Sequence, residues 1–149
     1  MARKINQEIK ILASNASVFS ALITPSSIQA WWEAKTAVVL AKAGGLMAIT
    51  WGDNIDKPDY VSVARIDLIE KDKQLQLAYE NYRSQSGGLP FEAHMIVIFS
   101  IEGTDYGCLL KVEQSGFPID KIADEYFNGC QIGWQTCLTN IKEFVELGN

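Results

Sequence analysis

Apolar and polar residues recur with two different periods along this chain, and the change of period predicts its architecture. From residue 119 to residue 147, apolar positions recur every three or four residues, and charged residues fill the positions between them. This spacing predicts one long amphipathic helix. The apolar stripe of the helix consists of Ile119, Ile122, Tyr126, Phe127, Cys130, Trp134, Cys137, Leu138, Ile141, Phe144 and Val145.

Most of the preceding chain alternates apolar and polar residues with a period of two, the pattern of half-buried strands. Strands are expected at residues 5–13, 36–41, 46–51, 61–69, 74–82, 91–101 and 106–114. Two short helices are expected after the first strand, at residues 16–23 behind the capping pair Ser14-Asn15, and from Ser26 or Ser27 to Trp32. Pro25 separates them, because proline ends a helix.

The strand pattern also predicts the register of two hairpins, since each register must collect the apolar side chains on one face. The first hairpin is expected to pair Leu68 with Leu75, Ile66 with Leu77, and Ala64 with Tyr79. The second is expected to pair Phe99 with Cys108, Val97 with Leu110, and Met95 with Val112. Residues 83–90 are predicted to form a mobile loop between the hairpins, and residues 115–118 a joint before the last helix.

Length and composition fit a single α+β domain over residues 1–149, with enough apolar residues for a sizeable core. The formal net charge of -5 disfavours nucleic acids and anionic membranes, which bind clustered lysines and arginines. The first residues are charged and lack the apolar stretch of a signal peptide, and no apolar run is long enough to cross a bilayer. We therefore expect a cytoplasmic protein.

The predicted registers place the ionisable residues of the strands on the face that points away from the apolar interior. These residues are Arg65, Asp67, Glu80, Glu92, His94, Lys111 and Glu113. General acid–base catalysis needs a titratable group directed into the site, so no catalytic residue is predicted. The only histidine and the aspartates of residues 52–60 lack the spacing of a metal site, so no metal or cofactor is expected. The polar side chains left inside are Tyr79, Cys108, Tyr126 and Cys130, with Ser62 or Gln114 as further candidates.

His94 and the cysteines are the remaining reactive side chains. His94 is expected opposite Glu113 as a surface ion pair, with a catalytic role as the alternative. Cys130 and Cys137 are seven residues apart on one helix, so their Cα atoms lie roughly 10 Å apart, too far for a disulfide. Cys108 has no predicted base beside it, so we expect inert thiols.

The space between the sheet and the long helix is the candidate ligand site. Its predicted lining consists of Trp32, Trp51, Ile66, Leu77, Tyr79, Met95, Val97, Cys108, Leu110, Tyr126, Cys130 and Trp134. The tryptophans could form the floor of a pocket, or they could be the core that fills it. Gly129 and Gly133 are costly inside a helix, and they indicate either close packing or free room beside it.

The order of elements and several short motifs resemble the helix-grip layout of the START-like, or SRPBCC, superfamily. Within it, the chain is most similar to the family named after the activator of heat-shock-protein-90 ATPase. The motifs are ASVFSALIT at residues 16–24, Trp31-Trp32, Gly44-Gly45 before the strand ending in Trp51, Gly103-Thr104, Ser115-Gly116-Phe117, Gly133-Trp134, Leu138, Ile141 and Val145-Glu146. Asp105 departs from the resemblance, because a basic residue is common after the threonine.

The resemblance implies a cavity that takes hydrophobic ligands, but it supplies no catalytic motif. Three functions remain open. The first is a binding module for a small, mostly uncharged apolar ligand. The second is a protein that acts through its surface, as a homodimer or on a chaperone, for which the outward-facing Ile96, Ile98 and Leu109 would serve as a patch. The third, an enzyme of cyclase or hydrolase type, would need a carboxylate or histidine inside the pocket.

Overall fold

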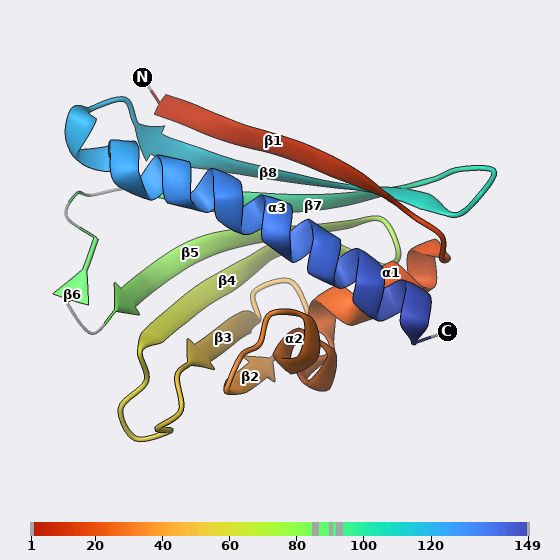
Figure 1. The fold of residues 1–149 in the computed structure, drawn as a ribbon, viewed down its shortest axis with the longest axis horizontal. Helices are drawn as coiled ribbons and strands as arrows, with labels where there is room; N and C mark the ends of the chain where they lie inside the picture. Colours follow the sequence, from red (N-terminus) through yellow and green to blue (C-terminus); the bar gives the residue numbers. More distant parts are fainter. Residues whose placement is uncertain (1, 85–86, 90, 92–93, 149) are drawn as a thin grey trace.

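The computed structural model of the chain describes residues 2–84, 87–89, 91 and 94–148. Figure 1 shows a curved sheet with one long helix lying across one of its faces, and two short helices near the C-terminal end of that helix. The elements in chain order are β1 (Ala2–Ile11), α1 (Asn15–Ile23), α2 (Pro25–Trp31), β2 (Thr36–Val39), β3 (Leu46–Trp51), β4 (Tyr60–Glu70), β5 (Gln74–Ser84), β6 (Gly87–Gly88), β7 (Ile96–Gly103), β8 (Cys108–Pro118), a 3₁₀ turn (Lys121–Ala123) and α3 (Asp124–Leu147).

The strands form one antiparallel sheet in the order β1-β8-β7-β5-β4-β3-β2, and the short β6 pairs with β5 off this path. The edge strands are therefore β1 and β2. We call the face covered by α3 the inner face and the opposite face the outer face. The predicted α+β helix-grip architecture, with two short helices after the first strand and six to seven strands around a long helix, is confirmed.

The two short helices begin where local hydrogen bonding favours a helix start. The Ser14 hydroxyl oxygen accepts a hydrogen bond from the Ser17 backbone N–H at 3.1 Å, which caps α1 as predicted. Pro25 is the first residue of α2. Proline is favoured at this position, because a backbone N–H there would have no partner within the helix. Thr24 lies between the two helices and is both the C-cap of α1 and the N-cap of α2.

The long helix begins at Asp124, five residues later than its apolar stripe suggested. Ile119 and Ile122 precede it and have exposed fractions of 55% and 57%, so their predicted place on the inner stripe is wrong. The reason is that β8 continues to Pro118 and a 3₁₀ turn follows. A 3₁₀ turn has three residues per turn and does not continue the phase of an α-helix.

The predicted register of β7 and β8 is wrong by four residues. Phe99 lies opposite Val112, and Val97 lies opposite Gln114. The turn is centred further along the chain than expected, because the Thr104 hydroxyl accepts hydrogen bonds from the N–H groups of Tyr106 and Gly107. A shift by an even number of residues leaves every side chain on its predicted face.

The register of β4 and β5 is confirmed for Ile66 opposite Leu77 and for Ala64 opposite Tyr79. Leu68, however, lies opposite Gln76, because an irregularity in β4 follows Ile66 and moves Ile69 opposite Leu75. Such an extra residue is a β-bulge, which the alternation of apolar and polar residues does not reveal.

The predicted joint at residues 115–118 is instead the last part of β8, and it contains a second bulge. Phe117 pairs with Arg3 and Ser115 pairs with Lys4 on β1, so Gly116 between them is the extra residue of the bulge. Its φ is +100°. A Cβ at this position would lie 2.2 Å from the His94 carbonyl oxygen, so the bulge requires glycine.

Residues 83–90 were expected to be a loop, and this is wrong for part of them. Arg83 and Ser84 belong to β5 and pair with Gly88 and Gly87 of β6. Residues 85, 86 and 90 lie outside the described residues, as do Glu92 and the side chain of Glu80.

Helix α3 packs chiefly on β1 and also meets β8, α1 and α2. Its C-terminal half is well buried: Leu138, Ile141 and Val145 are 3%, 0% and 4% exposed. In the N-terminal half, by contrast, Tyr126 and Cys130 face the same layer but are only half-buried. The layer between α3 and the sheet is therefore packed more tightly under the C-terminal half of α3 than under its N-terminal half.

Candidate functional site

The twelve predicted lining residues divide into two groups by burial. Seven are buried, namely Ile66, Leu77, Met95, Val97, Cys108, Leu110 and Trp134. Five are half-buried, namely Trp32, Trp51, Tyr79, Tyr126 and Cys130. All twelve belong to the core or pack against it.

Cys108 lies away from the half-buried group. It is the first residue of β8, opposite Ile11 and Gly103, near the end of the sheet that α1 covers. Phe117, nine positions further along the same strand, contacts Tyr126 at a ring-centroid distance of 5.9 Å. A strand of that length spans about 30 Å, so Cys108 and Tyr126 are at opposite ends of the interior.

The four tryptophans form one cluster. Trp32 is at its centre: it stacks on Trp31 at 4.9 Å, meets Trp51 edge-on at 5.3 Å, and lies 6.1 Å from Trp134. Trp31 and Trp134 are buried, whereas Trp32 and Trp51 are half-buried. Trp31 and Trp134 thus belong to the packed core, and the other two rings keep part of their surface accessible.

Each indole N–H in this cluster has an acceptor, which holds the rings in place. Trp31 donates to the Ala21 carbonyl at 2.8 Å, Trp51 to the Trp32 carbonyl at 3.1 Å, and Trp134 to the Gln114 side chain at 2.6 Å. Trp32 bonds to the thiol of Cys137 on α3. The cluster therefore links α2, β3, β8 and α3.

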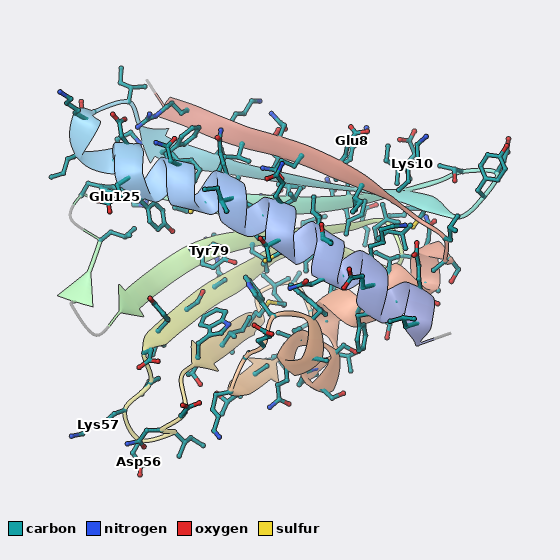
Figure 2. All side chains as sticks on the ribbon, in the orientation of Figure 1. Glu8, Lys10, Asp56, Lys57, Tyr79 and Glu125 are labelled. Atoms are coloured by element: carbon teal, nitrogen blue, oxygen red, sulfur yellow. The ribbon has the colours of Figure 1, made fainter. Side chains whose placement is uncertain are left out.

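A small group of neutral polar side chains lies beside the tryptophans. Tyr79 of β5 lies between its strand and α3 (Figure 2) and bonds to Ser62 of β4, which is 4% exposed. Burial, and then the nearby thiols of Cys137 and Cys130, raise the pKa of Tyr79 above its ordinary value, against the opposing effect of the Ser62 hydrogen bond. The phenol is therefore neutral at physiological pH.

The two thiols of α3 are neutral for the same reason. Burial raises the pKa of Cys137 to about 12, although the bond from Trp32 acts in the opposite direction. Burial also raises the pKa of Cys130, and a hydrogen bond with Tyr126 opposes it. A thiol with a raised pKa is a poor nucleophile, because the thiolate is the reactive form.

Charged side chains of the strands lie on the outer face, as the alternation predicted. Arg65, Asp67, His94 and Lys111 are exposed and Glu113 is half-buried. Among the described residues, the buried polar side chains are Ser62 and Gln114, and neither is charged. No group of three or more potential metal ligands occurs in this part of the chain.

The predicted pairing of His94 with Glu113 is wrong. Glu113 lies opposite Ile98, and its carboxylate is 3.5 Å from the amine of Lys4 on β1. His94 precedes β7 and is exposed. The cause is the four-residue difference in register, which moves the partner of every residue in the hairpin.

Sequence reasoning missed two residues of this region. Cys137 was predicted on the apolar stripe of the helix but not in the site, and it faces Trp32 and Tyr79. Phe91 is half-buried and contacts Tyr126 at 5.8 Å, and no pattern distinguished it from the strand in which it was placed. Ser62 and Gln114, which were candidates, are both buried.

Gly129 and Gly133 do not mark close packing. Both are exposed on α3, and a Cβ at either position would have no neighbour within 4 Å. Of the two interpretations, close packing is therefore wrong; the space beside the helix at these positions is open, and it lies on the side that faces solvent.

A separate open groove of about 350 Å³ lies at the other end of α3. Its walls come from α1, the start of α2 and the end of α3, with Ser17, Phe144 and Val145 among its lining residues. None of the twelve predicted residues lines it.

Comparison with known proteins identifies the family. The model of a family described as activator of Hsp90 ATPase homolog 1-like protein matches residues 12–146. The chain belongs to this family. Among curated proteins, none matches the sequence.

Solved structures share the fold of this Hsp90-ATPase-activator-like domain. A Mesorhizobium loti protein is 21% identical over 99% of both chains, with a TM-score of 0.80. A Staphylococcus aureus protein of unknown function is 13% identical, covering 99% of this chain and 96% of its own, with a TM-score of 0.78. The Aha1 dimer from Colwellia psychrerythraea is 16% identical, covering 99% and 98%, with a TM-score of 0.73. At these identities, the likeness establishes the START-like fold alone. Within the described residues, no helix has the length and apolar character needed to span a membrane.

Proposed function

We propose that this Hsp90-ATPase-activator-like domain is a non-catalytic binding module that holds a small apolar ligand between the sheet and α3. The observation that carries the proposal is the group of five half-buried side chains, Trp32, Trp51, Tyr79, Tyr126 and Cys130. They face the interior but keep accessible surface, whereas Leu138 and Ile141, further along α3 in the same layer, are buried.

The chemistry of these side chains favours an uncharged ligand. The described interior offers a phenol, two neutral thiols, the Ser62 hydroxyl and aromatic rings, with no charged side chain among its buried residues. A charged ligand would lose its hydration without gaining a countercharge, which costs several kcal/mol. A flat aromatic or aliphatic molecule with at most one or two polar atoms fits best.

Binding of Nile red, a neutral apolar dye, tests the proposal directly. We expect saturable binding that lipids or aromatic compounds displace. Cys130→Phe would fill the accessible end and weaken dye affinity by about tenfold or more. Gln135→Phe places the same ring on the exposed side of α3 and serves as the matched control, with unchanged affinity.

Native mass spectrometry of gently purified protein supplies an independent measurement, with a copurifying small molecule as the expected result. Absence of such a molecule together with absence of saturable dye binding would contradict the proposal. Equal weakening in Cys130→Phe and Gln135→Phe would also contradict the assigned position.

A second candidate function is action through the surface, by self-association and by contact with a chaperone. The family description and the dimeric Colwellia relative support it. The patch expected from sequence is divided, because Leu109 lies opposite Glu102 and Lys10 rather than beside Ile98. Exposed apolar side chains lie instead at the other edge of the sheet, where Val38 of β2 and Leu40, the residue after this strand, are 60% and 50% exposed.

Each part of this candidate has its own test. Sedimentation velocity measures self-association, and a strict monomer would remove the homodimer. For the chaperone, the ATPase rate of Hsp90 is measured with and without the protein. An unchanged rate at saturating protein would remove the chaperone role.

A further inference from the structure

The two edges of the sheet differ in how their backbone groups are protected. Along β1, the other elements already use free edge groups: the Lys142 amine donates to the Lys10 carbonyl at 3.1 Å, and the Leu12 N–H donates to the Glu146 carboxylate at 2.8 Å. Charged residues also occur along this strand, including the labelled Glu8 and Lys10 (Figure 2). Such an edge is protected against pairing with another chain.

The opposite edge, β2, is less protected (Figure 1). Helix α2 packs against it and Gln29 donates to the Lys35 carbonyl just before the strand, but no described residue makes such a bond to Ala37 or Val39. Residues 36–41 read TAVVLA and contain no charged side chain, no proline and no glycine. Val38 and Leu40 are 60% and 50% exposed on the outer face. An uncharged and exposed edge strand is a template for pairing with another strand.

The hydrogen-bond alternation of β2 shows which backbone groups are free. Leu40 donates to the Leu46 carbonyl, so the backbone groups of Leu40 and of Val38, two residues earlier, point toward β3. Ala37 and Val39 therefore direct their N–H and C=O groups away from the sheet. No described residue forms a hydrogen bond with these groups.

We propose that β2 pairs with β2 of a second copy of this chain, in antiparallel orientation about a two-fold axis at Val38, to form one continuous sheet. This inference rests on the self-association of the second candidate function. The register pairs Ala37 of each copy with Val39 of the other, and it satisfies all the free groups of these residues with four hydrogen bonds. A slip of one strand by one residue, which would put the axis between two residues, would bring groups that already bond to β3 against the free ones.

The same register makes the side chains and charges compatible. Val38 meets its own copy across the axis on the outer face, where Leu40 lies opposite Thr36. A two-fold interface must be self-complementary in this way. Each copy carries a net charge of -5, and residues 36–41 form an uncharged segment through which two acidic chains can meet.

Two variants disrupt the proposed seam by different means. Val39→Pro removes the Val39 N–H, which forms no hydrogen bond within the single chain. Proline is tolerated at such a position, because the N–H it lacks would point away from the sheet. Val38→Lys places two like charges at the axis, at a position where the single chain is 60% exposed. Leu46→Lys is the matched control: it lies on the outer face one strand further in and is 40% exposed. Circular dichroism checks the fold of each, and Val38→Lys decides the outcome if Val39→Pro does not fold.

Sedimentation velocity at concentrations up to roughly 100 µM measures the outcome. We expect a dimer for the wild type and for Leu46→Lys, and a monomer for Val39→Pro and Val38→Lys. A dimeric wild type in which the seam variants change nothing, or in which Leu46→Lys alone dissociates, would overturn this interface but leave self-association standing. A monomeric wild type would overturn both. Nile red affinity in the same variants should be unchanged, which separates this result from the ligand-binding proposal.

Discussion

The indole N–H of Trp134 donates to the side-chain oxygen of Gln114 at 2.6 Å, between α3 and β8, in a region where both side chains are almost fully buried. The bond holds the indole edge-on to Phe99 at 5.5 Å and near Trp32. It is a buried polar link between the long helix and the sheet in a mostly apolar layer, so its loss should affect stability.

Replacing Gln114 with leucine keeps the side-chain size but removes the acceptor for Trp134. The buried N–H would then be unsatisfied, and we expect a loss of about 1–3 kcal/mol in the free energy of unfolding. Urea denaturation measures it. Gln76→Leu makes the same replacement on the outer face opposite Ile98 and should change stability much less. Equal effects in the two variants would show that the Trp134 bond contributes nothing specific.

Gly129→Ala and Gly133→Ala should each stabilise the protein by roughly 0.5–1 kcal/mol. Both glycines are helical and exposed with open space at the Cβ position, so alanine gains helix propensity without a clash. Thermal or urea denaturation measures the change. Gly116→Ala is the contrasting control, because its Cβ would meet the His94 carbonyl at a positive φ, and it should destabilise the protein. A loss of stability in the helical variants would reveal a role for those glycines in the folded state.

Glu146 should make the stability of the protein depend on pH in the acidic range. The hydrogen bond from the Leu12 N–H, and then the bond from Lys142, hold the pKa of this carboxyl below its ordinary value. A folded-state pKa below the unfolded one means that the stabilisation is present above the unfolded pKa and is lost as pH falls through the folded pKa.

The variant Glu146→Gln isolates this contribution. Wild type should exceed the variant in stability at neutral pH, and the difference should shrink as the pH falls below about 4.5. Urea titrations of both proteins between about pH 3 and pH 7 measure it. A difference that stays constant over this range would show that ionisation of Glu146 is not linked to folding. Glu143→Gln, at an exposed position on the same helix, is the matched control.

The thiol of Cys137 should be almost unreactive in the folded protein. With its pKa raised to about 12, the thiolate fraction near pH 8 is about a thousandfold lower than for a free cysteine. Labelling with iodoacetamide, followed by mass spectrometry of the peptides, measures each site. We expect rapid labelling of Cys137 only in denaturant. Comparable rates in the folded and unfolded protein would contradict the burial and the raised pKa.

The order and type of the elements followed from the sequence because each depends on local periodicity. The alternation at Ile66, Leu77 and Tyr79 identified their common face, and Ser14 identified the start of α1. The failures share a cause as well. The bulges at Gly116 and after Ile66, the turn formed by Thr104, and the 3₁₀ turn before α3 each change a register without changing the hydrophobic pattern.

The candidate site, like the fold, was predicted from the sequence only in part. Sequence patterns collected the inward-facing residues, but they could not separate the buried Ile66 from the half-buried Tyr79, or place Cys108 at the far end of the sheet. Those distinctions depend on where α3 crosses the sheet. They also depend on which indole reaches which partner, such as Trp32 bonding to Cys137 across the interior.

By itself, the sequence determined that a charged outer face and an apolar inner face would surround a long helix, because side-chain direction alternates with a fixed period in any strand. Only the tertiary structure decided which end of that interior stays accessible and which edge of the sheet remains free. Both depend on contacts between residues far apart in the chain, such as Glu146 with Leu12, and such contacts leave no periodic trace in the order of amino acids.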